Sequence, residues 1–227
     1  MRQQATLRTT VSIDGVGLHS GHPVRAHFHP AAPGHGLVFV RLFHAAGFER
    51  QDAVVRPLVL GESVEVSRDD RRILYVPDGP GLTITYEIDF PHPIVGQQAL
   101  TFALRPEEFA ARIAPARTFG FTREVEALRS RGLARGGSLH NAVVLDDNGI
   151  VSGPLRFRDE FVRHKILDLV GDLALLGRPL HGRIHAWKAG HALHIEFARA
   201  LHAALARPAG RDVEVDDESA SATASRA

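Results

Sequence analysis

Alternating polar and apolar residues predict β-structure over most of the chain before Pro91. Residues 5–29 alternate around the turn signals Asp14-Gly15 and Ser20-Gly21, which predicts a strand, a turn and a second strand. The apolar run GLVFVRLF at 36–43 predicts a third strand. Short polar or Gly/Pro turns separate three further expected strands, at 58–67, 71–79 and 82–90.

Apolar residues spaced at the helical period dominate the second half of the chain and predict helices over 106–117, 122–133 and 163–176. Gly177 and Pro179 follow the last of these helices and mark its end. Two mixed segments complete the pattern: a hairpin at 142–153 around Asn148-Gly149, and residues 182–205, which begin as a strand and end as a helix.

Runs of strands followed by runs of helices are typical of an α+β layered fold rather than a doubly wound sheet. The 227 residues are enough for one large domain or two small ones with a sizeable core. The last stretch, 206–227, is acidic, rich in Ser and Ala and poor in apolar residues, so we expect a disordered tail.

Composition narrows the classes of function. The net charge of +1 gives no reason to expect a nucleic-acid partner. No run reaches the roughly 18 apolar residues of a membrane span, and the N-terminus has no apolar signal region, so we expect a cytoplasmic protein without stable membrane insertion. The absence of cysteine excludes thiolate ligands, whereas 14 histidines leave imidazole and carboxylate sites open to zinc or a neighbouring metal.

The predicted helix at 163–176 carries charged residues that are costly to bury unless they are paired or bound to a metal. His164 and Asp168 are four residues apart, so both side chains share one helical face and can reach one cation. Asp172 lies one turn further along, where a carboxylate can orient a functional histidine, and the Lys165 ammonium can stabilise developing negative charge. A solvated stripe of His and Asp explains the same spacing without a metal.

Three further stretches have both a structural and a functional interpretation. His19 lies in GVGLHSGHP (15–23), where a plain hairpin turn is the simpler reading. In ARTFGF (116–121) an exposed Thr118 hydroxyl beside an aromatic face would suit a sugar ring and an oxyanion, although core packing explains the phenylalanines equally well. Lys188 and His191 flank a glycine in WKAGHALH, which a surface turn also explains.

Taken together, these stretches resemble the UDP-3-O-acyl-N-acetylglucosamine deacetylases, the zinc enzymes that commit a sugar nucleotide to lipid A synthesis. The resemblance follows the family's order and covers most of residues 5–200. It rests on six blocks: TLRTTVSIDGVGLHSG, IDFPHPIVGQQ, PARTFGF, SRGLARGGSLHNAVVLDD, LRFRDEFVRHKILDLVGDL and HAWKAGHAL.

The resemblance implies a role for each flagged residue. His164 and Asp168 match two of the three ligands of Zn²⁺, and His191 matches a proton-donating histidine that Asp172 orients. The remaining positions match groups that contact substrate: Lys165 and Thr118 at the oxyanion, Phe119 against the sugar, Lys188 near the nucleotide diphosphate, and His19 in the substrate-binding loop. The segment from ARTFGF to SRGLARGG matches the insert that helps to form the acyl-chain passage.

The implied reaction is hydrolysis of the N-acetyl amide of a UDP-sugar lipid precursor. We expect the protein to be a monomer. Zinc lowers the pKa of its bound water and polarises the carbonyl, a general base assists the attack, and His191 protonates the departing amine. The implied fold is a two-layer sandwich of two related β-β-α-α-β halves with helices packed between the sheets.

The chain departs from the family in its first half. The family's E-H-L-x-x-A-L helix, which supplies the remaining zinc-binding histidine and the proposed general-base glutamate, has no counterpart here. Several tens of residues are missing between Arg41 and Leu42. We therefore expect a truncated first domain at 1–57, a complete second domain at 58–205, and impaired activity. His44 and His19 are alternatives as a substitute third ligand.

Two hypotheses follow from this departure. The chain is a zinc-dependent deacetylase by descent, or it is a non-catalytic relic that keeps a sugar-nucleotide-binding surface. The retained histidine and aspartate positions favour the first, and the absent Glu-His pair favours the second.

Overall fold

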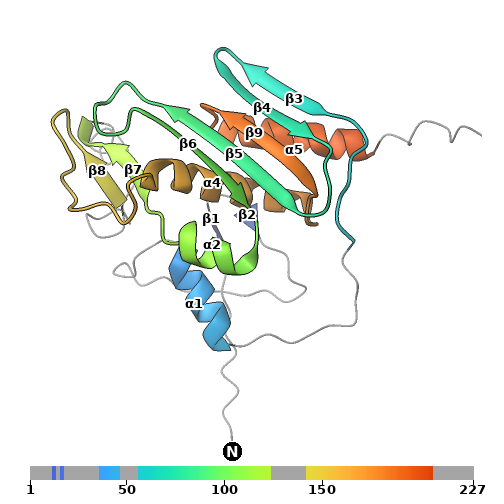
Figure 1. Cartoon of the computed structure of the whole chain (residues 1–227), viewed down its shortest axis with the longest axis horizontal. Coiled ribbons are helices and arrows are strands. Elements are labelled where there is room, and N and C mark those ends of the chain that lie inside the picture. The colour runs from blue at the N-terminus through green and yellow to red at the C-terminus, as the bar shows by residue number, and fades with distance from the viewer. Residues whose placement is uncertain (1–11, 14–15, 18–35, 47–55, 124–141, 207–227) are drawn as a thin grey trace, which may run out of the picture.

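A five-stranded sheet with helices on one face forms the centre of the molecule (Figure 1). The computed structural model describes residues 12–13, 16–17, 36–46, 56–123 and 142–206. The sheet strands are β3 (Val64–Arg68), β4 (Arg71–Val76), β5 (Leu82–Asp89), β6 (Gln97–Ala103) and β9 (Gly182–Trp187). The helices against its inner face are α4 (Glu160–Leu173) and α5 (His191–Leu205). This arrangement confirms the predicted α+β class.

The sheet order, β3-β4-β9-β5-β6, places the last strand of the chain in the middle. β3–β4 and β5–β6 are antiparallel hairpins. β9 lies between them, antiparallel to β4 and parallel to β5. The chain returns directly from β9 into α5, so the start of α5 lies beside α4.

The core lies between the sheet and the two helices. Along β5 the side chains alternate strictly, and Ile84, Tyr86 and Ile88 point inward while their neighbours face outward. Ile166 of α4 and Phe197 of α5 are fully buried members of the same cluster. The apolar side of α4 therefore faces the sheet, and its polar residues are left on the remaining sides.

The segment Gly36–Ala46 is a helix, α1, and the strand predicted at 36–43 is wrong. Arg41 is the one polar residue of the run at 36–43, so its periodicity does not distinguish a strand from a helix. The Leu37 N–H donates to the Ala114 carbonyl over 2.9 Å, which fixes the start of α1 beside α4 and the chain that follows α2 (Pro106–Arg112).

Other boundaries shift by a few residues. The strand predicted at 58–67 begins only at Val64, and the helix predicted at 106–117 ends at Arg112. β6 and the short strand β7 (Thr118–Phe121), which pairs in parallel with β8 (Ala142–Leu145), were not predicted. β8 turns back at Asn148-Gly149 to an isolated bridge at Ile150, as the predicted hairpin requires.

Several predictions agree closely with the structure. β1 (Ser12–Ile13) pairs antiparallel with β2 (Val16–Gly17), as the first part of the predicted strand–turn–strand requires, and the predicted turn residues Asp14-Gly15 lie outside the described residues. α4 continues into a short 3₁₀ turn, η1 (Ala174–Leu176), which ends at Gly177 with a φ of +70°. The predicted Ser20-Gly21 turn, most of the helix at 122–133 and the tail from 207 onward lie outside the described residues. The domain boundaries at 57 and 205 stay predictions.

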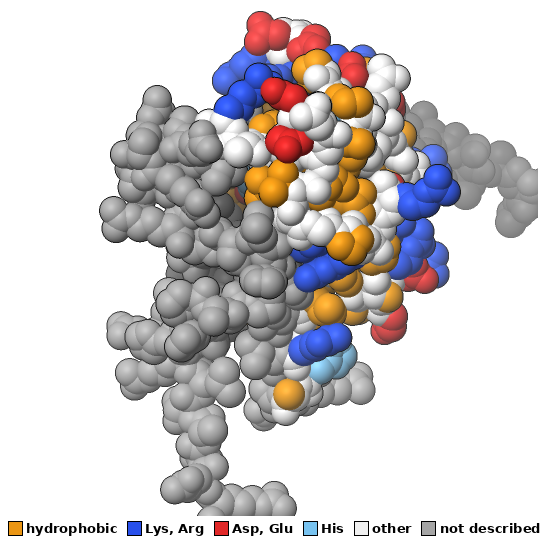
Figure 2. Space-filling model, turned by 90° about the vertical axis from the view of Figure 1, so that its left-hand side faces the viewer, with side chains coloured by type: hydrophobic (Ala, Val, Ile, Leu, Met, Phe, Trp, Pro, Cys, Tyr) orange, Lys and Arg blue, Asp and Glu red, His pale blue; other side chains and the backbone are white. Residues whose placement is uncertain are grey.

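Within the described part of the chain, no helix is both long and apolar enough to cross a bilayer. On the face seen in Figure 2, hydrophobic, basic and acidic side chains are intermingled, so neither sign of charge dominates it.

Candidate metal centre

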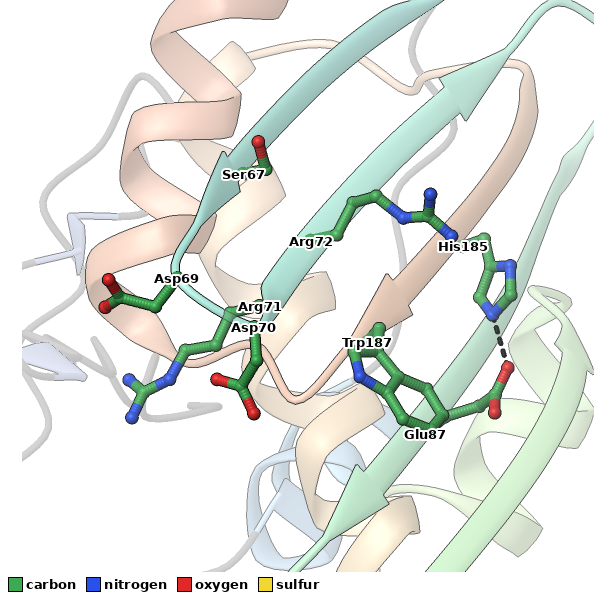
Figure 3. Close-up of a pocket in the computed structure, with 8 residues that line it drawn as sticks. All are labelled: Ser67, Asp69, Asp70, Arg71, Arg72, Glu87, His185 and Trp187. Atoms are coloured by element: carbon green, nitrogen blue, oxygen red, sulfur yellow. Dashed lines mark hydrogen bonds and ion pairs between the residues drawn. The ribbon is translucent and has the colours of Figure 1, made fainter.

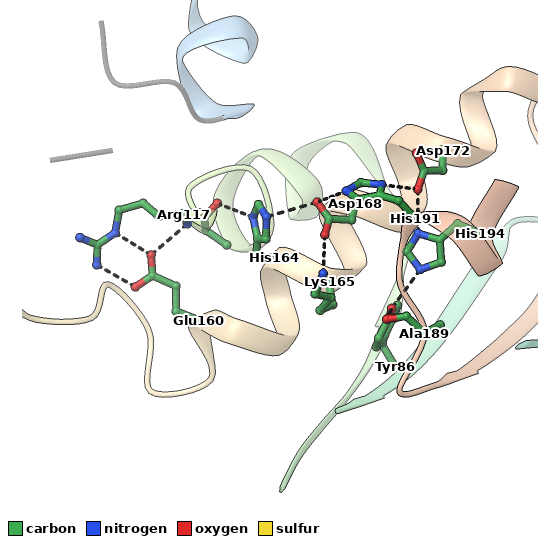
Figure 4. A network of polar contacts seen from close by, with 11 residues as sticks. Tyr86, Arg117, Glu160, His164, Lys165, Asp168, Asp172, Ala189, His191 and His194 are labelled. Atoms are coloured by element: carbon green, nitrogen blue, oxygen red, sulfur yellow. Dashed lines mark hydrogen bonds and ion pairs between the residues drawn. The ribbon is translucent and has the colours of Figure 1, made fainter. Parts of the chain in front are cut away.

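The polar face of α4 carries His164, Lys165, Asp168 and Asp172 along successive turns, and these side chains form one connected polar network (Figure 4). The side chains of His164, Lys165 and Asp168 are only 11–18% exposed. The prediction that His164 and Asp168 share one face of a helix is correct in geometry.

His164 is oriented as a neutral metal ligand would be. Its Nδ1 lies 3.4 Å from the Ala116 carbonyl, to which it can only donate, and this leaves the Nε2 lone pair available. Nε2 lies 3.2 Å from Asp168 Oδ1. Burial lowers the pKa of His164, which favours the neutral form that binds metals.

Asp168 is held in its ionised form by its neighbours. Burial alone would raise the pKa of Asp168, but the electrostatic interactions with His164 and with the Lys165 ammonium outweigh burial and lower it. Lys165 Nζ donates to Asp168 Oδ2 over 2.9 Å, so Oδ1 is the oxygen that faces the two histidines.

His191 begins α5 and reaches the same carboxylate from the other side. Its Nε2 lies 3.7 Å from Asp168 Oδ1, and its Nδ1 lies 2.7 Å from Asp172 Oδ2. The hydrogen bond to Asp172 raises the pKa of His191, and the side chain is 52% exposed. When such a half-exposed imidazole is protonated, it is suited to donate a proton to a leaving group.

His194 and Tyr86 extend this network into the core and were not anticipated from the sequence. His194 Nδ1 lies 2.7 Å from Asp172 Oδ2, and its Nε2 lies 2.9 Å from the Tyr86 hydroxyl. The only local signal is the spacing of His191 and His194, which puts both on one side of α5. The tyrosine partner is 108 residues away in sequence.

Asp172, His191 and His194 are, among the described residues, the one group of three whose potential ligand atoms lie within 4.8 Å of one another. Both imidazoles approach the same Asp172 oxygen through Nδ1. A metal bound by these atoms would have to replace both hydrogen bonds, so we interpret the group as a hydrogen-bonded triad. His44 lies on α1 and is not in a group of this kind with His164 and Asp168; His19 lies outside the described residues.

The ARTFGF stretch lies beside His164 and Lys165. Thr118, exposed, begins β7, and the ring of Phe119 follows it. The Phe119 ring centroid lies 6.3 Å from that of His164 and 5.8 Å from Lys165 Nζ. A sugar ring placed against Phe119 would therefore have the lysine ammonium at its edge.

A hollow of about 580 Å³ opens next to Lys165. Lys188 and Arg71 contribute positive charge to it, Asp70 and Asp89 contribute negative charge, and Phe90 contributes an aromatic face. Lys188 has a φ of +49° and its Nζ donates to Asp70 at 3.0 Å and Asp89 at 2.9 Å, which fixes the ammonium at the rim. The hollow therefore presents an aromatic face beside charges of both signs.

A second hollow of about 520 Å³ lies on the outer face of the sheet (Figure 3). Trp187, Arg72 and the His185–Glu87 pair line it, and Asp70 and Arg71 are shared with the first hollow. None of the predicted site residues lines it.

Comparisons with known proteins agree with the geometry. The profile of the UDP-3-O-acyl N-acetylglycosamine deacetylases matches residues 4–45 and 38–203. UDP-3-O-acyl-N-acetylglucosamine deacetylase of Oleidesulfovibrio alaskensis is 47% identical over 173 residues, covering 76% of this chain and 56% of that protein. The enzyme of the same name from Leptospira biflexa is 45% identical over 172 residues, covering 76% and 57%. The chain thus spans little more than half the length of these relatives.

The relative of the same name from Myxococcus xanthus is 35% identical over 268 aligned positions, covering 86% of this chain and 85% of that protein. The alignment is longer than the 227 residues of this chain, so the relative has residues that find no counterpart here. This agrees with the predicted internal deletion.

Proposed function

Because the chain belongs to the UDP-3-O-acyl N-acetylglycosamine deacetylase family, we propose that it is a zinc-dependent hydrolase. Its substrate would be UDP-3-O-acyl-N-acetylglucosamine, from which it removes the N-acetyl group in lipid A biosynthesis. The observation that carries this proposal is the convergence on Asp168 Oδ1, with His164 Nε2 at 3.2 Å and His191 Nε2 at 3.7 Å.

His164 Nε2 and the Asp168 carboxylate would hold the zinc ion. Imidazole nitrogen and carboxylate oxygen are ligands that zinc accepts, and catalytic sites normally take three such protein ligands. The described residues offer two at this point, so the third position is open. When bound, zinc lowers the pKa of its water and polarises an amide carbonyl.

The remaining residues would bind the substrate and move a proton. Lys165 Nζ and the Thr118 hydroxyl would stabilise the oxyanion, and Phe119 would lie against the sugar. Lys188 would bind the diphosphate at the rim of the hollow. His191 Nε2, with Nδ1 held by Asp172, would donate its proton to the departing amine.

The missing general base sets the expected rate. General acid–base catalysis contributes about 10²–10⁴-fold, so a chain without the family's glutamate is expected to turn over more slowly by that factor than its complete relatives. The proposal therefore concerns a slow enzyme.

A non-catalytic sugar-nucleotide-binding protein is the second candidate. It is favoured by the absent Glu-His pair and by a match to little more than half of the first two relatives. The hollow beside Lys165 and Lys188 would be retained in this case for binding alone.

Zinc content and deacetylation of UDP-3-O-acyl-N-acetylglucosamine, measured on the same preparation, separate the two. One zinc per chain, with turnover that His164→Ala abolishes, supports the enzyme. His202→Ala, at an exposed position on α5, is the matched control and should leave both values unchanged. A folded protein that binds the UDP-sugar but holds no zinc and shows no turnover overturns the enzyme and supports the binding protein.

A further inference from the structure

His194 is a fully buried imidazole that the proposed reaction does not use. It lies one helical turn after His191 on α5, with its ring centroid 5.8 Å from that of His191. Buried polar groups are almost always hydrogen-bonded, and both ring nitrogens of His194 have a partner: Asp172 and Tyr86.

The hydrogen atom between His194 and Asp172 can be assigned. His194 Nδ1 lies 2.7 Å from Asp172 Oδ2 and donates to this carboxylate, because burial lowers the pKa of His194 and two bare lone pairs would repel each other. The Tyr86 hydroxyl then lies within hydrogen-bond distance of two acceptors, the Ala189 carbonyl at 2.8 Å and His194 Nε2 at 2.9 Å.

Asp172 Oδ2 is shared between the two histidines. It lies 2.7 Å from Nδ1 of each, but the His191 side chain is 52% exposed and the His194 side chain is 0% exposed. A half-exposed ring that competes with water fixes a carboxylate poorly. The buried ring, anchored at its far end by Tyr86, fixes it well (Figure 4).

We propose that His194, which is anchored by Tyr86, is a positioning residue that fixes Asp172 Oδ2. The fixed carboxylate holds the proton of neutral His191 on Nδ1. As a result, Nε2 of His191 faces Asp168. The functional part of this inference rests on the proposed role of His191 as the proton donor. The structural part concerns the apo chain alone.

The tautomer of His191 tests the proposal. Nitrogen-15 NMR on histidine-labelled full-length protein, at a pH where His191 is neutral, distinguishes Nδ1–H from Nε2–H, and loss of the signal in His191→Ala assigns it. The wild type should show mainly Nδ1–H, whereas a histidine without such a carboxylate is mainly Nε2–H.

Two amide variants form a matched pair. The side-chain nitrogen of Asn overlays the Nδ1 position of histidine, and that of Gln overlays Nε2. His194→Asn keeps a donor toward Asp172 and should leave His191 mainly Nδ1–H. His194→Gln directs its donor toward Tyr86 and should make Nε2–H the major form. His202→Gln, at an exposed position on the same helix, should have no effect.

A shift in His194→Gln that is absent in His194→Asn, with native amide spectra in both, supports the proposal. Equal behaviour of the two variants, or a wild-type His191 that is mainly Nε2–H, overturns it. The measurement needs neither zinc nor turnover, so a chain that fails to hydrolyse the sugar nucleotide still gives a decisive result.

Discussion

At the residue scale, the buried pair Arg117–Glu160 links the ARTFGF stretch to the first turn of α4. Glu160 is fully buried and accepts from the Arg117 backbone N–H, the Arg117 guanidinium and the Arg156 N–H. Ala116, whose carbonyl faces His164, directly precedes Arg117. The pair therefore fixes the position of the carbonyl that orients the candidate zinc ligand.

Replacing Glu160 by Gln should strongly destabilise the fold. The change leaves the buried Arg117 guanidinium without its counter-charge, and the new amide group of Gln points a donor toward groups that also donate. Breaking a buried ion pair in this way lowers the free energy of unfolding by about 3–5 kcal/mol. Urea unfolding measures the loss. The control is Glu108→Gln, which breaks the exposed Arg112–Glu108 pair and should lower the free energy of unfolding by only about 0.3–0.5 kcal/mol. Similar losses in the two variants would contradict this account of Glu160.

Protonation of Glu160 should contribute to the fall in the free energy of unfolding at acidic pH. Burial opposes ionisation of Glu160, but the hydrogen bonds from Arg117 and Arg156 outweigh it and hold the pKa of Glu160 below its ordinary value of 4.5. A carboxyl group with a lowered folded-state pKa contributes stability above its unfolded pKa and loses it as pH falls through the folded pKa. Unfolding titrations from pH 6 downward should show a smaller loss in Glu160→Gln than in wild type.

At the element scale, two glycines of the described chain have opposite requirements. Gly182 begins β9 with a φ of +127°, and a Cβ there would lie 2.5 Å from the ring of Tyr75. That ring is fully buried and its hydroxyl donates to the His181 carbonyl over 2.8 Å, so it cannot move aside. Gly171 lies within α4, and a Cβ there meets nothing within 4 Å.

Gly182→Ala should therefore destabilise the protein by at least about 2 kcal/mol, through backbone strain and overpacking. Gly171→Ala should stabilise it by about 0.5–1 kcal/mol, because alanine is the better helix former. Thermal unfolding of the two variants should shift in opposite directions. Shifts of the same sign would show that one of the two glycine environments is described wrongly.

Sequence patterns predicted the elements whose period is unambiguous. The helix around His164 was predicted because its apolar residues follow the helical period and Gly177 ends it. GLVFVRLF was assigned wrongly because a run with a single polar residue, Arg41, has no period that separates a strand from a helix. The proximity of His164 and Asp168 follows from their i, i+4 spacing. The contact of His194 with Tyr86 depends on how α5 packs on β5, which no local pattern encodes.

At the scale of the whole molecule, the proposed deletion can be tested by restoring the segment. Inserting the residues of the Myxococcus xanthus relative that lack a counterpart here, between Arg41 and Leu42, should supply a third zinc ligand and a general base. We expect one zinc per chain and a rise in deacetylation of about 10²–10⁴-fold. The control is the same insert with Glu and His of the E-H-L-x-x-A-L motif changed to alanine.

A folded chimera that holds no zinc would contradict the assignment of His164 and Asp168 as two ligands of an incomplete set. A chimera that binds zinc without added turnover would instead contradict the expectation that the inserted segment supplies the general base.

The central place of β9 has a consequence for how the protein is made. The hairpins β3–β4 and β5–β6 leave the ribosome well before the strand that joins them. Until β9 arrives, β4 and β5 each present an unpaired edge, which is a template for pairing with another nascent chain. A messenger RNA truncated before the codon for Gly182 would yield two hairpins with unpaired, aggregation-prone edges instead of a sheet. A chaperone would therefore matter most in the interval before β9 has been translated.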